Sequence, residues 1–311
     1  MYHDPIPNKS FPLNLSSEDA HARVLDPTTS KSFVFFFDAA LCTPSMDPNT
    51  KQQRLAPDDR AYVRSPAINR LVRDIVADVH GKPLYIQRGA CLHKRQEACG
   101  NSAAAIQETY SDANVFGFVP TKDKAVSQVK GAIQFDHARS LHPVEVFVDS
   151  ITRVAGKDKT DKEGNKIDGL DETMGDTPGI YYGLFRLTGT YSAITAEGRN
   201  ITPEMLGMYL DGLFRGWEHA RSSLRSGVTM LGGYVYDHGH RAFGGMNLQD
   251  CVGDVRVTLR EGLDAPRSTE DYTFEIVSDV LPRQMTRVFV SGSRMQQERL
   301  LGITYTSEMS A

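Results

Sequence analysis

Basic side chains gather in the first third of the chain at spacings that suit phosphate binding. The set on and before an amphipathic segment comprises Lys51, Arg54, Arg60, Arg64, Arg70 and Arg73. Arg70 and Arg73 are three residues apart, so on a helix they share one face. Guanidinium groups bind phosphate through paired hydrogen bonds, and such contacts position a nucleic-acid strand without reading its sequence. The alternative is a charged helix face that only contacts water.

Two further polar sets have the same chemical character. The first follows an apolar segment at 132–135 and comprises His137, Arg139, Ser140, His142, Thr152 and Arg153. These side chains can donate to phosphates and to ribose 2′-hydroxyl groups, although a polar turn around Pro143 also explains them. The second is Arg221 and Arg225, helical neighbours that could face RNA or an adjoining subunit. Basic residues also favour a helix C-terminus through its dipole.

Residues 157–177 form a charged segment with four lysines and seven acidic residues. The segment contains glycine and almost no apolar residues, which predicts a protruding hairpin tip. It accounts for a net charge of −3 out of the −4 of the whole chain. The remainder is nearly neutral, and a nearly neutral protein can still carry a basic groove because local charge decides the contact.

Enzymatic motifs are scarce. The chain has neither a P-loop nor a Gly-x-Ser-x-Gly elbow. His238 and His240 have a spacing that metal ligands can adopt, but no carboxylate set accompanies them. Asp38 ends an apolar run, where a structural or capping role is the favoured interpretation. We therefore predict no catalytic residue, no metal and no cofactor.

The elements that must position these side chains follow from the apolar patterns. An apolar run at 32–41 predicts a central strand. Ser65, as N-cap, and Pro66 open a helix with an apolar stripe from Ile68 to Val79, and Thr202-Pro203 open a second one. We expect helical structure at 90–110 and strands at 84–87, 115–119, 132–135, 144–148, 180–191, 228–236, 254–261, 272–280 and 286–291.

This order of elements predicts an α+β fold with a ferredoxin-like, β-α-β-β-α-β sheet, the topology of the RNA recognition motif. We expect an irregular N-terminal arm at 1–30 and one domain at 31–291. Insertions would form a finger at about 84–130 and a thumb hairpin at about 155–180, before a polar tail at 292–311. No apolar run is long enough for a membrane span, and no secretory signal is evident. The four cysteines form no Cys-x-x-Cys pair, so we expect reduced thiols and a cytoplasmic protein.

Five short motifs resemble those of the Cas7 family of CRISPR effector proteins, most closely the type I-C form, Csd2. They are Gly131-Ala-Ile-Gln134, Arg139-Ser-Leu-His-Pro143, Ile151-Thr-Arg153, Thr173-Met-Gly175 and Tyr182-Gly-Leu-Phe-Arg186. The segment Glu218-His-Ala-Arg-Ser222 is also similar to one in Csd2. The resemblance runs from about residue 33 to 227 and is strongest over 131–186.

The resemblance implies a non-enzymatic backbone subunit whose copies assemble head to tail along crRNA. The guide would pair with target DNA, and the partners would be Cas5-like and Cas8-like subunits, with Cas3 recruited by the complex. It also implies RNA contacts from the basic sets above. A thumb would displace a guide nucleotide, and Thr173 and Met174 would lie at the end of the thumb hairpin. Met174 would wedge between bases. Three residues, Pro66, Asn69 and Asp176, depart from the family pattern.

Two other functions remain open from the sequence. One is a metal-dependent ribonuclease on the same scaffold, which would need carboxylates clustered near the phosphate path. The other is a single-stranded RNA-binding protein outside CRISPR systems, which would bind RNA as a monomer. Steep salt dependence would not separate these possibilities, because every phosphate binder shows it.

Overall fold

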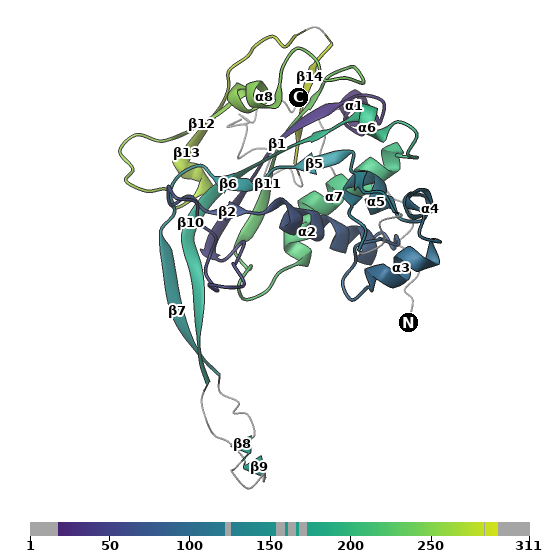
Figure 1. The fold of residues 1–311 in the computed structure, drawn as a ribbon. Coiled ribbons are helices and arrows are strands. Elements are labelled where there is room, and N and C mark those ends of the chain that lie inside the picture. Colours follow the sequence, from purple (N-terminus) through teal and green to yellow (C-terminus); the bar gives the residue numbers. More distant parts are fainter. Residues whose placement is uncertain are drawn as a thin grey trace, which may run out of the picture.

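A computed structural model of the chain describes residues 18–121, 126–153, 159–160, 166–167, 173–282 and 284–291. Its centre is an antiparallel sheet built around β1 (Lys31–Cys42) (Figure 1). The strand order is β14 (Thr286–Val290), β11 (Val228–Asp237), β1, β10 (Thr173–Tyr191), β6 (Ala138–Ser140) and β2 (Tyr62–Val63). Two more strands, β5 (Ile133–Phe135) and β7 (Val146–Arg153), also pair with β10.

Two helices, α2 (Ser65–Asp78) and α7 (Pro203–His219), cover one face of this sheet. The predicted apolar stripes are buried there, together with Phe33, Phe35 and Phe37 of β1. The helices approach closely because α7 carries glycine where they touch. A Cβ atom at Gly212 or Gly216 would lie only 2.9 Å from an atom of Val72 or Leu71 of α2, respectively.

The other face of the sheet is covered over part of its area by a second, smaller layer. Val34 and Phe36 of β1 pack there with Tyr272 and Val255. The layer consists of α8 (Leu248–Asp254), β12 (Val255–Leu259) and β13 (Tyr272–Ile276), preceded by the 3₁₀ turn Thr269–Asp271. β1 is therefore apolar on both faces, as its continuous apolar sequence predicted.

The predicted α+β class is confirmed. The main elements alternate along the chain as strand, helix, strands, helix and strand. They are β1, then α2, then β5, β6 and β10, then α7, and last β11. Every neighbouring pair in the central sheet is antiparallel. The ferredoxin-like label stays a prediction.

The described residues of the insertion at 84–130 form three short helices and one strand pair. These elements are α3 (Leu92–Ala98), α4 (Ala103–Thr109), α5 (Ser111–Val115), β3 (Gly117–Phe118) and β4 (Val129–Lys130). They enclose a small core of their own around Tyr85, Ile106 and Phe118. One link to the main domain is Asp112, a fully buried carboxylate that accepts hydrogen bonds from the side chain of Arg73 and the backbone of Tyr85 and Ile86.

A long hairpin leaves the body of the molecule where β7 pairs with the first half of β10 (Figure 1). The pairing runs from Val146 opposite Ile180 to Arg153 opposite Thr173. At the distal end β8 (Lys159–Thr160) pairs with β9 (Lys166–Ile167). The hairpin begins at Val146, before the thumb predicted at about 155–180, and many residues of that range lie outside the described part of the chain, so the thumb stays a prediction. Strand β10 begins earlier than the predicted strand, at Thr173.

Several local expectations differ from the structure. A helix, α1 (Glu18–Leu25), forms within the arm expected to be irregular, because Val24 and Leu25 are buried in the main core. Residues 84–87 form no strand, and a further short helix, α6 (Ala193–Ala196), follows β10. Arg64, not Ser65, is the N-cap of α2, and no side chain caps that end; the Ser65 amide donates to His137 Nδ1 instead.

The predicted cap of α7 is confirmed, since the Thr202 hydroxyl accepts from the Met205 amide. All four cysteines are free thiols, as expected. Among the described residues, no helix is both long and apolar enough to cross a bilayer. The expected tail at 292–311 and most of the N-terminal arm lie outside the described residues.

We predict that Asp112→Ala destabilises the protein by about 3–5 kcal/mol, because it leaves the Arg73 guanidinium buried without its anion. Chemical denaturation would measure the loss. The matched control is Glu275→Gln, which removes the exposed ion pair with Arg256 and should change stability by less than about 1 kcal/mol. Equal effects of the two substitutions would contradict the role given to Asp112.

Candidate nucleic-acid interface

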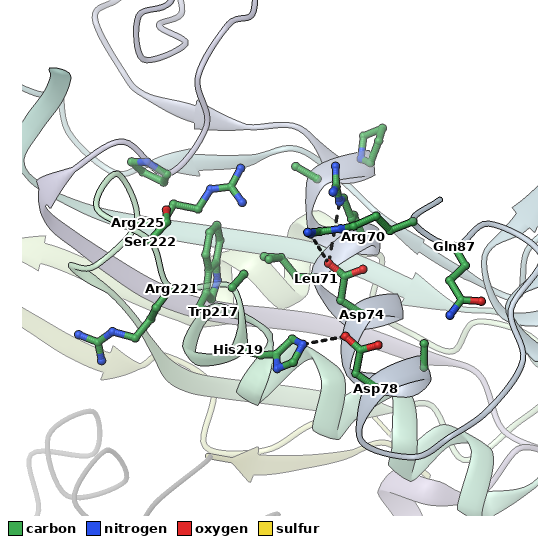
Figure 2. Close-up of a pocket in the computed structure, with 16 residues that line it drawn as sticks. Arg70, Leu71, Asp74, Asp78, Gln87, Trp217, His219, Arg221, Ser222 and Arg225 are labelled. Carbon is green, nitrogen blue, oxygen red and sulfur yellow. Dashed lines mark hydrogen bonds and ion pairs between the residues drawn. The ribbon is translucent and has the colours of Figure 1, made fainter. Parts of the chain in front are cut away.

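A groove of about 760 Å³ lies between α2, from Pro66 to Asp78, and the end of α7 (Figure 2). Arg70 and Asp74 line it from α2, and Arg225 lines it from the segment after α7. The buried Trp217 ring and Leu71 form its base. The structure thus brings together two of the arginines that the sequence placed in different sets.

Positive charge exceeds negative charge on the inner wall of this groove. The Asp74 carboxylate lies 3.9 Å from Arg70 Nε and 3.4 Å from Arg88 Nη2, so one anion serves two cations. Arg225 is half-buried, and no described residue forms a hydrogen bond or ion pair with its guanidinium. Burial, and then the nearby charges of Arg70 and Arg88, lower the pKa of Arg225. An incoming phosphate would relieve this excess of positive charge.

Arg221 also lines the groove, but its guanidinium points away from Arg70 (Figure 2). It donates to the carboxylate of Glu218 at 3.0 Å and to the carbonyl of Ser226 at 2.9 Å. In the middle of α7, the Asp211 carboxylate bonds to Arg215 and to His80, which follows α2, and so ties the two helices together. The two predicted helix-end arginines therefore differ: Arg225 faces the groove, and Arg221 closes the helix end.

Arg73 lies apart from the groove. Only 8% of it is exposed, and its Nε donates to Asp112 at 2.8 Å. Arg70 and Arg73 do not share an exposed face of α2 as expected. Arg73 faces the insertion, whereas Arg70 is exposed. The Arg73 guanidinium is therefore bonded to a buried carboxylate and does not face the groove.

The loop before α2 holds the remaining members of the first basic set. Arg54 forms an ion pair with Asp47, whereas Lys51 and Arg64 are exposed. The pKa of the Asp47 carboxyl is lowered, chiefly by the Asn49 amide and also by Arg54. Lys51 and Arg64 are therefore the members of this loop whose charges face solvent.

The polar set that follows residues 132–135 is divided between strand β6 with its flanking residues and strand β7. His137 and Arg139 are exposed, whereas Ser140 is buried on the opposite side of the strand. The Ser140 hydroxyl donates to the His142 carbonyl and accepts from the Ala61 amide, so its hydrogen bonds are structural. Arg139 pairs with Asp58 at 2.5 Å.

Four predicted contacts belong to the hairpin. Thr152 stands opposite Met174, and Arg153 opposite Thr173, so the pairing of β7 with β10 brings together motifs that are twenty residues apart. The side chains of these four residues lie outside the described part of the structure. Asp176, which departs from the family pattern, is exposed and stands opposite Ser150 of β7.

The residues of the metal-dependent alternative are engaged in other bonds. His238 is buried; its Nε2 bonds to the Ser32 hydroxyl, and its Nδ1 accepts from the Gly244 amide. Asp38 accepts from the Thr269 hydroxyl at 2.9 Å, which joins the sheet to its second layer. Within the ranges described, no three His, Cys, Asp or Glu side chains form a group suited to a metal ion.

Two arginines near these surfaces were not among the predicted contacts. Arg88 reaches the groove from an irregular loop, and its sequence signal is charge alone. Arg186 is half-buried in β10 and ends the last of the five family-like motifs. An arginine inside an apolar strand could have been recognised as unusual, because arginine is rarely buried without a partner.

Comparison with known families now bears on these surfaces. The family described as CRISPR-associated protein Cas7 matches residues 29–277. The chain belongs to the Cas7 family. No curated protein matches it in sequence.

Two similar chains occur in solved structures of CRISPR RNA-guided surveillance complexes. One, from a pre-nicking complex, has 13% sequence identity and a TM-score of 0.43, with 67% of this chain and 78% of that chain covered. The other has 17% identity and a TM-score of 0.35, with 66% and 68% covered. The type I-C assignment of this Cas7 protein stays a prediction.

We predict that stability falls as the pH drops from 7.5 to 5.5, and that His238 contributes to this fall. Burial lowers the pKa of His238 in the folded state, whereas the unfolded chain has an ordinary value of about 6.5. Below that value the unfolded chain takes up a proton that the folded protein does not, so stability is lost.

Thermal unfolding at the two pH values would measure this effect. His238→Asn should lower the unfolding temperature at pH 7.5 and weaken its dependence on pH. His93→Gln, which alters an exposed histidine, is the control for the loss of one imidazole at the surface. An unaltered pH dependence in His238→Asn would contradict the assignment.

Proposed function

We propose that this Cas7 protein is a guide-binding backbone subunit of a type I CRISPR surveillance complex and that the groove between α2 and α7 holds the crRNA backbone. The observation that carries this proposal is the excess of arginine over carboxylate in the groove. Its two carboxylates are Asp74 and Asp78, of which Asp78 pairs with His219. Four arginines line the same groove: Arg70, Arg88, Arg221 and Arg225. Arginine forks suit phosphate oxygens, and contacts of this kind do not depend on base sequence.

The finer features of the proposal rest on the motifs as well as the groove. The Csd2-like segment Glu218–Ser222 forms the end of α7 and the turn after it, beside Arg225, which supports a type I-C protein. The projecting β7–β10 hairpin supports head-to-tail assembly, because a segment that leaves the body can reach a neighbouring copy; such contacts build an open filament. Met174 remains the proposed wedge residue.

The proposed division of labour assigns sequence recognition to base pairing between the guide and target DNA. Cas5-like and Cas8-like subunits would complete the complex, and Cas3 would supply the nuclease. The subunit itself would bind RNA without cutting it, in the cytoplasm of a prokaryote. The engaged side chains of His238 and Asp38 favour this function over the metal-dependent ribonuclease.

We predict that co-expression with a repeat-containing RNA yields a ribonuclease-resistant oligomer with several protein copies per RNA. Size-exclusion chromatography with light scattering would measure its mass, and protein expressed without that RNA is the control. A monomer that ignores the RNA, or one that binds it without assembling, would contradict the backbone role. Loss of RNA that a chelator prevents would support the ribonuclease instead.

We predict that Arg225→Gln weakens the binding of a short single-stranded RNA and lowers the slope of log K against log salt concentration by about 0.7, because one phosphate contact is lost. Fluorescence anisotropy at several salt concentrations would measure both quantities. The matched control is Arg256→Gln on β12, whose arginine pairs with Glu275 away from the groove. Equal slopes for the two variants would rule out the groove as the phosphate site.

A further inference from the structure

A row of side chains crosses three strands on the sheet face that points away from α2 and α7. Arg186 of β10 stands opposite Arg139 of β6, which stands opposite Tyr62 of β2. Directly paired residues project from the same face at about 5 Å spacing. Arg186 also pairs with Phe36, whose side chain lies in the second core beneath α8 and β13. The row is therefore on the other side of the sheet from the groove.

Positive charge is in excess in this row as well. Asp58 pairs with Arg139 at 2.5 Å and lies 3.6 Å from Arg60 Nε. Arg186 is half-buried, and within the described ranges no side chain or carbonyl forms a hydrogen bond or ion pair with its guanidinium. Burial, and then the charge of Arg60, lower its pKa. Asp58 therefore serves two of the three arginines, and Arg186, on a strand position directly paired with Arg139, adds a like charge that repels them.

Aromatic rings border these arginines on the outer edge of the sheet. The Tyr62 and His137 rings are parallel, with an interplanar angle of 7° and centroids 6.2 Å apart. Tyr62 is half-buried, His137 is exposed, and β2 is the last strand of the sheet, so the pair is open to solvent. Rings beside a basic track bind successive bases of single-stranded nucleic acids without sequence preference.

A histidine beside Arg60 adds an unused polar atom. The His142 ring packs against Tyr272, with centroids 5.3 Å apart. Its buried Nδ1 has no hydrogen-bond partner among the described residues. Burial, and then Arg60, lower the pKa of His142, so the ring is neutral near pH 7. Because this nitrogen is buried, His142 contributes an unsatisfied polar atom next to the row and not an exposed contact for RNA.

We propose that Arg60, Tyr62, His137, Arg139 and Arg186 form a second RNA site, the sheet-face site, that holds one nucleotide of a single strand. The base stacks on the Tyr62–His137 pair, and the phosphate pairs with Arg60 and Arg186. A protein carboxylate would satisfy the arginines but leave the two rings uncovered, so the ring pair favours a nucleotide. The inference rests on the proposed function and adds a contact on the face opposite the groove.

The test compares two probes with the full-length protein: a short fluorescein-labelled oligouridine and a strand with the same sugar–phosphate backbone but no bases. Tyr62→Leu should weaken oligouridine binding about tenfold and leave the abasic strand unaffected, because only the stack is lost. Arg186→Gln should weaken both probes and lower the salt slope by about 0.7. Arg186→Lys, which keeps the charge at this half-buried position, should retain the slope, and Arg256→Gln is the neutral control.

The outcomes separate this inference from the proposed function. If Tyr62→Leu and Arg186→Gln bind both probes like the wild type while Arg225→Gln is impaired, the sheet-face site is wrong and the groove stands. If Tyr62→Leu weakens both probes equally, the stacked base is wrong. Wild-type protein that binds neither probe overturns the proposed function and the sheet-face site together. Thermal unfolding of each variant confirms that it is folded before binding is compared.

Discussion

The rest of the structure depends on β1 being buried on both of its faces and hydrogen-bonded along both of its edges. Phe35 and Phe37 point to the helices, and Val34 and Phe36 to the second layer, with no solvent exposure. A strand of this kind needs a layer on each side, because its phenylalanine rings are stable only out of water. The second layer covers the sheet around β1 but leaves the row at β6 and β2 uncovered, and the sheet-face site lies on this uncovered part.

The arginines discussed above differ in whether a carboxylate neutralises them, and this sets the role of each. Arg73 is buried against Asp112 and stabilises the insertion. Arg70 shares Asp74 with Arg88, so neither cation is fully neutralised. Arg225 and Arg186 are half-buried and have no carboxylate partner among the described residues. Such uncompensated charge lowers stability and is typical of surfaces that wait for an anion.

Net charge says little about this kind of binding. The chain is acidic overall, at −4, because acidic residues are concentrated between 157 and 177. The groove and the sheet-face site each hold more arginine than carboxylate, and local charge sets the potential that a phosphate meets. Subunits with little net charge can also lie side by side along a guide without strong mutual repulsion, which suits a backbone subunit.

The sequence by itself determined the elements with strong periodicity and the family. The stripe of α2, the cap of α7, the apolar run of β1 and the projecting hairpin all follow from local patterns, because burial and capping act over a few residues. Only the tertiary structure decided which arginine side chains lack a carboxylate partner and can pair with a phosphate. Arg70 and Arg73 look alike in sequence, yet Asp112, far along the chain, buries one of them. Helix packing places Arg88 and Arg225 in the same groove, and strand pairing places Arg186 and Tyr62 in the same row. No local pattern encodes such contacts between distant segments.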